Sequence, residues 1–139
     1  MAADSEQARP TTDELRPIFR AHAELCKALA NEHRQAILHT VCDREMCVGD
    51  IAVAIGISVH NVSQHLRILK ERGLVVPRKE GQTVYYSVTN QKFIQACGLI
   101  RQALVEQHLA EGESWSSAEL LGDGGGLPAP PSAASALQD

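Results

Sequence analysis

The chain has 139 residues, of which 44% are hydrophobic and 4% aromatic, and its formal net charge is −4. This length suits one domain with tails, and its core must be built from aliphatic side chains. No apolar run approaches the roughly 20 residues that cross a membrane, and the first residues lack the apolar segment of a secretory signal, so we expect a cytoplasmic protein. In that compartment the four cysteines are expected to be thiols, metal ligands or redox groups rather than disulfides.

The first third of the chain predicts an arm and two helices. Residues 1–12 are polar and are expected to form a disordered N-terminal arm. A helix is predicted from Asp13, with Pro17 near its first turn, where proline is tolerated. Five of its residues recur at helical spacing and predict a buried face. These residues are Ile18, His22, Leu25, Cys26 and Leu29. A second helix is predicted over residues 32–41, and a short extended segment over residues 46–48.

Residues 51–73 form the stretch around which the chain is organised. They predict two short helices joined by a tight turn at Gly56, the second helix capped by Ser58 and ended by Gly73. The inner face of this second helix is apolar and consists of Val62, Leu66 and Leu69, with Val59 and Ile68 at its flanks. Its outer face is polar or basic and consists of Ser58, His60, Asn61, Ser63, Gln64, Arg67 and Lys70. A helix with these two faces is suited to the DNA major groove.

A change of period after Gly73 predicts a β-hairpin. Residues 74–76 and 83–88 are rich in β-formers and surround a basic tip at residues 79–82, while Pro77 suits an edge position. Between residues 60 and 82 there are five Lys or Arg and two Glu, whereas acidic residues concentrate near both ends of the chain. One basic face on an acidic body favours binding to nucleic acid.

A last helix is predicted from Asn90 to about Leu109. Its apolar stripe consists of Phe93, Cys97, Ile100 and Leu104. Together with the first helix it predicts a dimer interface, the alternative being an intramolecular core. Residues 112–139 are rich in Gly and Pro and are expected to form a flexible tail. The domain is therefore placed at residues 13–111.

Three segments resemble the ArsR/SmtB type of transcriptional repressor. They are the entry to the second helix (residues 25–34), the Met-Cys-Val-Gly-Asp-Ile segment (residues 46–51), and the second helix of the pair with its hairpin (residues 62–75, 78–81 and 85–86). The resemblance covers roughly residues 20–105. It implies a mainly α fold with a small β-hairpin, the winged helix-turn-helix, which dimerises through its first and last helices. It also implies a repressor that leaves DNA when a metal ion, a metalloid or a reactive sulfur species binds.

The interface with double-stranded operator DNA is expected to include both the helix and the hairpin. Asn61 and Gln64 can pair with adenine, while side chains further along the helix hold the backbone. The predicted contacts are Ser58, His60, Asn61, Ser63, Gln64, His65, Arg67 and Lys70 in the helix and Arg78, Lys79, Gln82 and Thr83 in the hairpin. The alternative for His65 is that its side chain turns toward the core and does not contact DNA. A homodimer would present two such helices about one DNA turn apart, to an inverted repeat.

The candidate sensing residues are Cys42, Cys47, Cys97 and Cys26, and they follow no template of the family closely. The arsenical type needs a second cysteine where this chain has Gly49. The ligand positions of the zinc type hold Asn90, Lys92, Ala103 and Glu106, three of which are poor ligands. The persulfide-sensing type pairs a cysteine of the second helix with one of the last, and Cys42 and Cys97 lie about one turn later and two turns earlier than that pattern.

Two functions remain open on the sequence. The first is a repressor released by a thiol-reactive inducer, which includes arsenite, zinc, cadmium, persulfide or an oxidant. The alternative is a winged-helix regulator without an inducer site, whose cysteines are structural. The chain has no nucleophile elbow, phosphate loop or paired carboxylates, so we do not expect an enzyme.

Overall fold

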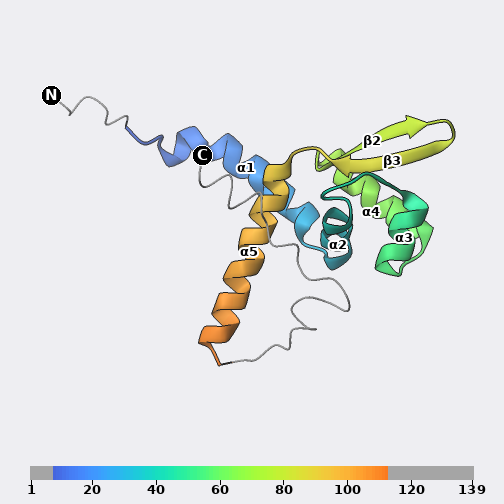
Figure 1. The fold of residues 1–139 in the computed structure, drawn as a ribbon. Coiled ribbons are helices and arrows are strands. Elements are labelled where there is room, and N and C mark those ends of the chain that lie inside the picture. Colours follow the sequence, from blue (N-terminus) through green and yellow to red (C-terminus); the bar gives the residue numbers. More distant parts are fainter. Residues whose placement is uncertain (1–7, 113–139) are drawn as a thin grey trace. The chain divides into compact units, whose positions relative to one another are not determined.

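The structure is a computed structural model, and it describes residues 8–112 (Figure 1). The chain divides into two units, the first ending at Ser87 and the second beginning at Val88. Most of the predicted arm and nearly all of the predicted tail lie outside the described residues. Among residues 8–112, no helix is both long and apolar enough to span a membrane.

Helix α1 runs over Thr12–Leu29 and begins with a capping box. The Thr11 hydroxyl accepts from the Glu14 N–H at 3.2 Å, and the Glu14 carboxylate accepts from the Thr11 N–H at 2.7 Å. Pro17 was predicted near the first turn, but it is the sixth residue of α1 and lies in the second turn. Pro17 has no N–H to give to the carbonyl of Asp13, so the helix lacks one hydrogen bond at that point.

The prediction that this face of α1 is buried is also wrong for the single chain. Ile18 is 60% exposed, His22 and Cys26 are exposed, and Ala28 is the one buried residue among those of α1. Within the first unit, only the C-terminal end of α1 meets another helix (Figure 1). Helical periodicity identified the apolar face correctly, but no element of the first unit covers most of it.

The core of the first unit lies where three helices and one strand meet. These elements are α2 (Glu32–Thr40), α3 (Val48–Ile55), α4 (Val59–Glu71) and β2 (Val75–Glu80). The core side chains are aliphatic, as the composition required, and eight of them are less than 2% exposed. These eight are Ile37, Leu38, Val41, Ile51, Val62, Leu66, Leu69 and Leu74.

The predicted hairpin belongs to a three-stranded sheet with the order β1-β3-β2. Strand β1 (Met46–Cys47) pairs antiparallel with β3 (Thr83–Val88), with Met46 opposite Tyr86 and Cys47 opposite Tyr85. β2 lies at an edge, as Pro77 predicted, and it extends to Glu80. The predicted tip is therefore shorter than expected and centres on Gly81, whose φ of 61° favours glycine.

The second unit contains α5, which runs over Gln91–Ala110 and is capped by the Asn90 side chain. That side chain accepts from the Lys92 N–H at 2.9 Å. No described residue of α5 is buried. Four large apolar side chains are 46% to 65% exposed, namely Leu99, Ile100, Leu104 and Leu109. Ile100 and Leu104 belong to the predicted stripe, so the second half of that stripe is exposed and available for a partner.

Candidate nucleic-acid interface

Helix α4 begins and is anchored as the sequence predicted. Gly56 takes a left-handed conformation with φ of 73° and turns the chain from α3 toward α4. The Ser58 hydroxyl then accepts from the Asn61 N–H at 3.1 Å and caps α4. Val62, Leu66 and Leu69 are 0% exposed on the inner side. The inner face holds α4 rigidly against the core, so its opposite face is fixed in direction.

The outer face of α4 is exposed along its whole length. All seven side chains predicted for it are exposed, from Ser58 to Lys70. The Gln64 side-chain nitrogen lies 3.1 Å from Nε2 of His60, one turn earlier. Arg67 and Glu71 form a long ion pair at 4.0 Å. The amides and the basic groups therefore stand in solvent, where they can exchange these partners for base edges and phosphates.

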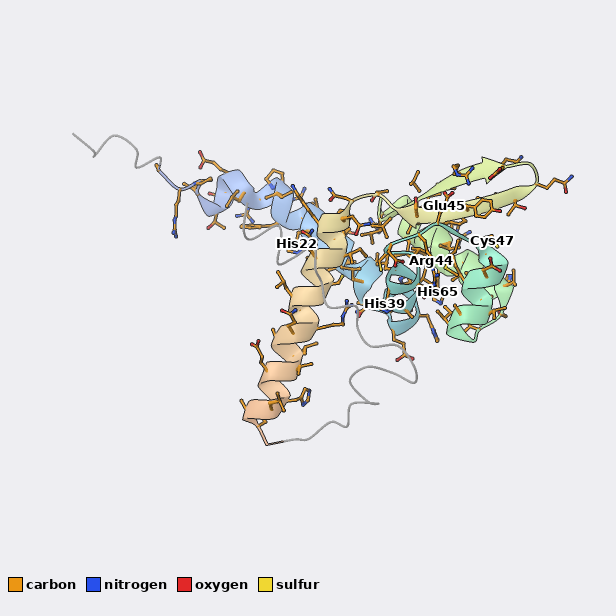
Figure 2. All side chains as sticks on the ribbon, in the orientation of Figure 1. His22, His39, Arg44, Glu45, Cys47 and His65 are labelled. Carbon is orange, nitrogen blue, oxygen red and sulfur yellow. The ribbon has the colours of Figure 1, made fainter. Side chains whose placement is uncertain are left out.

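His65 is half-buried and turns toward α2 rather than outward (Figure 2). Its Nδ1 lies 3.5 Å from Nη1 of Arg34, and its ring centroid lies 5.7 Å from that of His33. Burial of the ring, followed by the charges of Arg34 and His33, lowers the pKa of His65. These contacts favour the inward alternative for His65, and its role as a DNA contact stays a prediction.

Arg34 connects three helices of the first unit. Its Nε donates to the Ala28 carbonyl at 2.6 Å and its Nη2 to the Lys27 carbonyl at 3.2 Å, both at the C-terminal end of α1. A cation is favoured at that end of a helix, because the last carbonyls lack partners. Arg34 thus joins α1 to α2 and reaches His65 on α4.

The basic residues of the hairpin differ in their surroundings. Arg78 forms ion pairs with Glu45 at 2.6 Å and with Glu80 at 3.1 Å. Lys79, Gln82 and Thr83 are exposed. Among the residues that the structure describes, Lys79 forms no ion pair. The sequence did not single out Glu45, because its partner is 33 positions away and no local pattern connects them.

The four thiols lie on different parts of the fold, and none forms a disulfide. Cys26 is exposed on α1, Cys47 is half-buried in β1, and Cys97 is half-buried in α5. Cys42 follows the C-cap of α2 and is not part of that helix. Within residues 8–112, no group of three or more His, Cys, Asp or Glu side chains is placed to hold a metal ion.

Comparison with known proteins identifies the class. Residues 31–76 match the model of the family described as bacterial regulatory protein, arsR family. A transcriptional repressor SmtB homologue from Synechocystis is 34% identical over 110 residues, which cover 78% of this chain and 80% of that protein. The transcriptional activator HlyU from Vibrio cholerae is 44% identical over 66 residues, which cover 48% of this chain and 61% of that protein. The chain spans 50% to 64% of the length of HlyU and of two further curated relatives.

A solved structure from Mycobacterium bovis has the same architecture. It is the homodimeric winged helix-turn-helix DNA-binding domain of a possible ArsR-family regulator. The similarity has a TM-score of 0.62 and 29% identity, covering 78% of this chain and 100% of that one. The fold is therefore the winged helix-turn-helix, in which α4 is the recognition helix and β2 and β3 form the wing. The chain belongs to the ArsR family of bacterial regulatory proteins, a family of transcriptional regulators and not of enzymes.

Proposed function

We propose that this chain is a sequence-specific DNA-binding repressor that acts in the cytoplasm as a homodimer. The observation that carries the proposal is the division of α4 into two faces. Its inner residues are 0% exposed, while its outer polar and basic residues are all exposed beside a wing. Such a helix can enter the major groove while its back remains packed on the domain.

The proposed contacts divide into those that read bases and those that hold the backbone. Asn61 and Gln64 carry amides that can pair with two groups on adenine at once. Ser58, His60 and Ser63 lie near the start of the helix, where phosphates and base edges are both within reach. Arg67 and Lys70, with Lys79, Gln82 and Thr83 of the wing, are proposed to contact phosphates or the minor groove.

A dimer is supported by the apolar surface left exposed on α1 and α5. Ile18 and Phe19 on α1 are 60% and 49% exposed, and Ile100 on α5 is 57% exposed. Each of these helices therefore offers apolar side chains that a second copy of the chain could cover. A two-fold dimer would present its two recognition helices about one turn of DNA apart, so the proposed operator is an inverted repeat.

The proposal is tested by selecting duplexes from a random pool with the full chain and measuring affinity by fluorescence anisotropy. Asn61→Ala and Gln64→Ala should each weaken binding to the selected duplex by about 1–3 kcal/mol. Sedimentation should show an unchanged dimer for both variants. Gln102→Ala removes an amide from the exposed surface of α5 and is the matched control, with affinity as in the wild type. Failure to select any sequence would contradict the proposal.

We further propose that a thiol-reactive inducer releases the protein from DNA, acting on Cys42 and Cys47 or on Cys26 and Cys97. The half-buried thiol of Cys47 supports the first pair, because it lies in β1 directly before α3 (Figure 2). A change at that thiol would act on the entry to the helix-turn-helix. The coupling between inducer and DNA is expected to be about 1–3 kcal/mol, as in other allosteric proteins.

The test for release uses the protein bound to its selected duplex. Arsenite, zinc, cadmium, an inorganic persulfide donor and peroxide are titrated in turn, first on the wild type and then on each Cys→Ser variant. At least one agent should release the wild type, and at least one variant should resist it. If no agent releases DNA, the alternative holds, namely a winged-helix regulator without an inducer site whose cysteines are structural.

A further inference from the structure

A cluster of side chains spans the small sheet from one outer strand to the other. Glu45 directly precedes β1, Tyr85 lies on the central strand β3 opposite Cys47, and Arg78 lies on β2. We call Glu45, Arg78 and Tyr85 the wing clasp. Glu45 lies 33 positions before Arg78 in the chain, and the two meet because β1 and β2 both lie next to β3.

Glu45 of the clasp and the neighbouring Glu80 together provide partners for all three nitrogens of the Arg78 guanidinium. Nε lies 3.1 Å and 3.0 Å from the two Glu45 carboxylate oxygens, and Nη2 lies 2.6 Å from Oε1. Nη1 lies 3.1 Å from Oε2 of Glu80. The guanidinium carbon lies 5.1 Å from the centre of the Tyr85 ring, within the range of a cation–π contact. Two hydrogen-bonding nitrogens on one carboxylate make the strong, directional form of this ion pair.

We propose that Glu45 and Arg78 are positioning residues that fix the wing relative to the segment leading into α3, and that Arg78 is not itself a DNA contact. The proposal rests on the proposed DNA-binding function. A two-stranded hairpin is marginally stable by itself, and the backbone partner of this one is only the two-residue strand β1. The clasp supplies a second connection between the same two parts of the fold.

The next residue along β2 is better placed to bind DNA. Successive side chains of a strand point to opposite faces, so Lys79 points away from the face that carries Arg78. Lys79 is exposed, and it has no ion-pair partner in the part of the chain that the structure describes. The guanidinium of Arg78, by contrast, is paired with the carboxylates of both Glu45 and Glu80, which would repel a phosphate placed there.

The two possible roles of Arg78 predict opposite effects. If Arg78 bound a phosphate, lysine would serve nearly as well, and removing the charge of Glu45 would strengthen DNA binding. If Arg78 positions the wing, lysine fails because it lacks the planar fork that matches a carboxylate. Glu45→Gln should then weaken DNA binding although it makes the protein more positive.

The test uses the full chain with Glu45→Gln, Arg78→Lys, the double variant, and Lys79→Gln as the control from the same strand. Hydrogen exchange of the amides in residues 75–88 should become faster in the first three variants and stay unchanged in the control. Affinity for the selected duplex should fall by about threefold to tenfold in each clasp variant, and no further in the double variant. Lys79→Gln should instead make the affinity depend less on salt. The slope of log affinity against log salt concentration should become smaller by about 0.9 for each phosphate that the protein no longer neutralises.

Three results would overturn the inference. They are wild-type affinity in Arg78→Lys, tighter binding in Glu45→Gln, and unchanged amide exchange in both variants. If the wild type selects no DNA, the proposed function fails, whereas the exchange measurement still decides whether the clasp holds the wing.

Discussion

Arg34→Ala tests the connection between α1 and the helix-turn-helix. The substitution removes the donors that reach the Ala28 carbonyl at 2.6 Å and the Lys27 carbonyl at 3.2 Å. A hydrogen bond from a charged group contributes about 1.5–3 kcal/mol to stability. The hydrogen bond to Ala28 is partly buried and should contribute this full amount, whereas the hydrogen bond to Lys27 is exposed and should add little. The free energy of unfolding should therefore fall by about 2–3 kcal/mol.

The neighbouring residue provides a matched control. Gln35 donates from Nε2 to the Leu29 carbonyl at 2.7 Å, at the same end of α1, but the contact is neutral and exposed. Gln35→Ala should cost about 0.5–1.5 kcal/mol. Urea unfolding followed by circular dichroism measures both variants, at one protein concentration because association shifts apparent stability. A loss for Arg34→Ala no larger than that for Gln35→Ala would refute the reasoning.

Two further predictions concern turn geometry and pH. Gly49 and Gly56 both have open space where a Cβ would lie, but only Gly56 has a positive φ, of 73°. Gly49→Ala should therefore raise the free energy of unfolding by about 0.5–1 kcal/mol, and Gly56→Ala should lower it by about 1–2 kcal/mol, as read from urea unfolding. Burial and the charge of Arg34 lower the pKa of His65 from 6.5, so folding favours the neutral ring. Stability should decline as the pH falls below that value, because the unfolded chain then binds more protons, and His65→Gln should reduce the decline in urea midpoints. An equal decline in that variant would assign the effect to other groups.

The parts of the fold that depend on local sequence could be predicted. The Ser58 cap, the turn at Gly56 and the buried back of α4 each follow from residues within a few positions of one another. The face of α1 was identified by its period, but a period does not reveal whether another element covers that face. Ile18 is accordingly 60% exposed in the single chain.

The parts of the site that depend on long-range pairing could not be predicted. Strand β1 has two residues and takes its place only by pairing with β3, nearly forty positions later. That pairing places Glu45 within reach of Arg78, and the packing of α4 against α2 places His65 beside Arg34. Composition showed that the region was basic, but only the three-dimensional arrangement showed that one of its arginines is bound by two carboxylates.

The central claim is that the outer face of α4 reads DNA sequence, and DNA binding by Asn61→Ala and Gln64→Ala is its sharpest test. Anisotropy titrations compare the selected duplex with a scrambled duplex at one salt concentration, because phosphate contacts make affinity depend on salt. We expect each variant to lose about 5-fold to 150-fold in affinity for the selected duplex and little for the scrambled one. Undiminished preference for the selected duplex in both variants would contradict the claim.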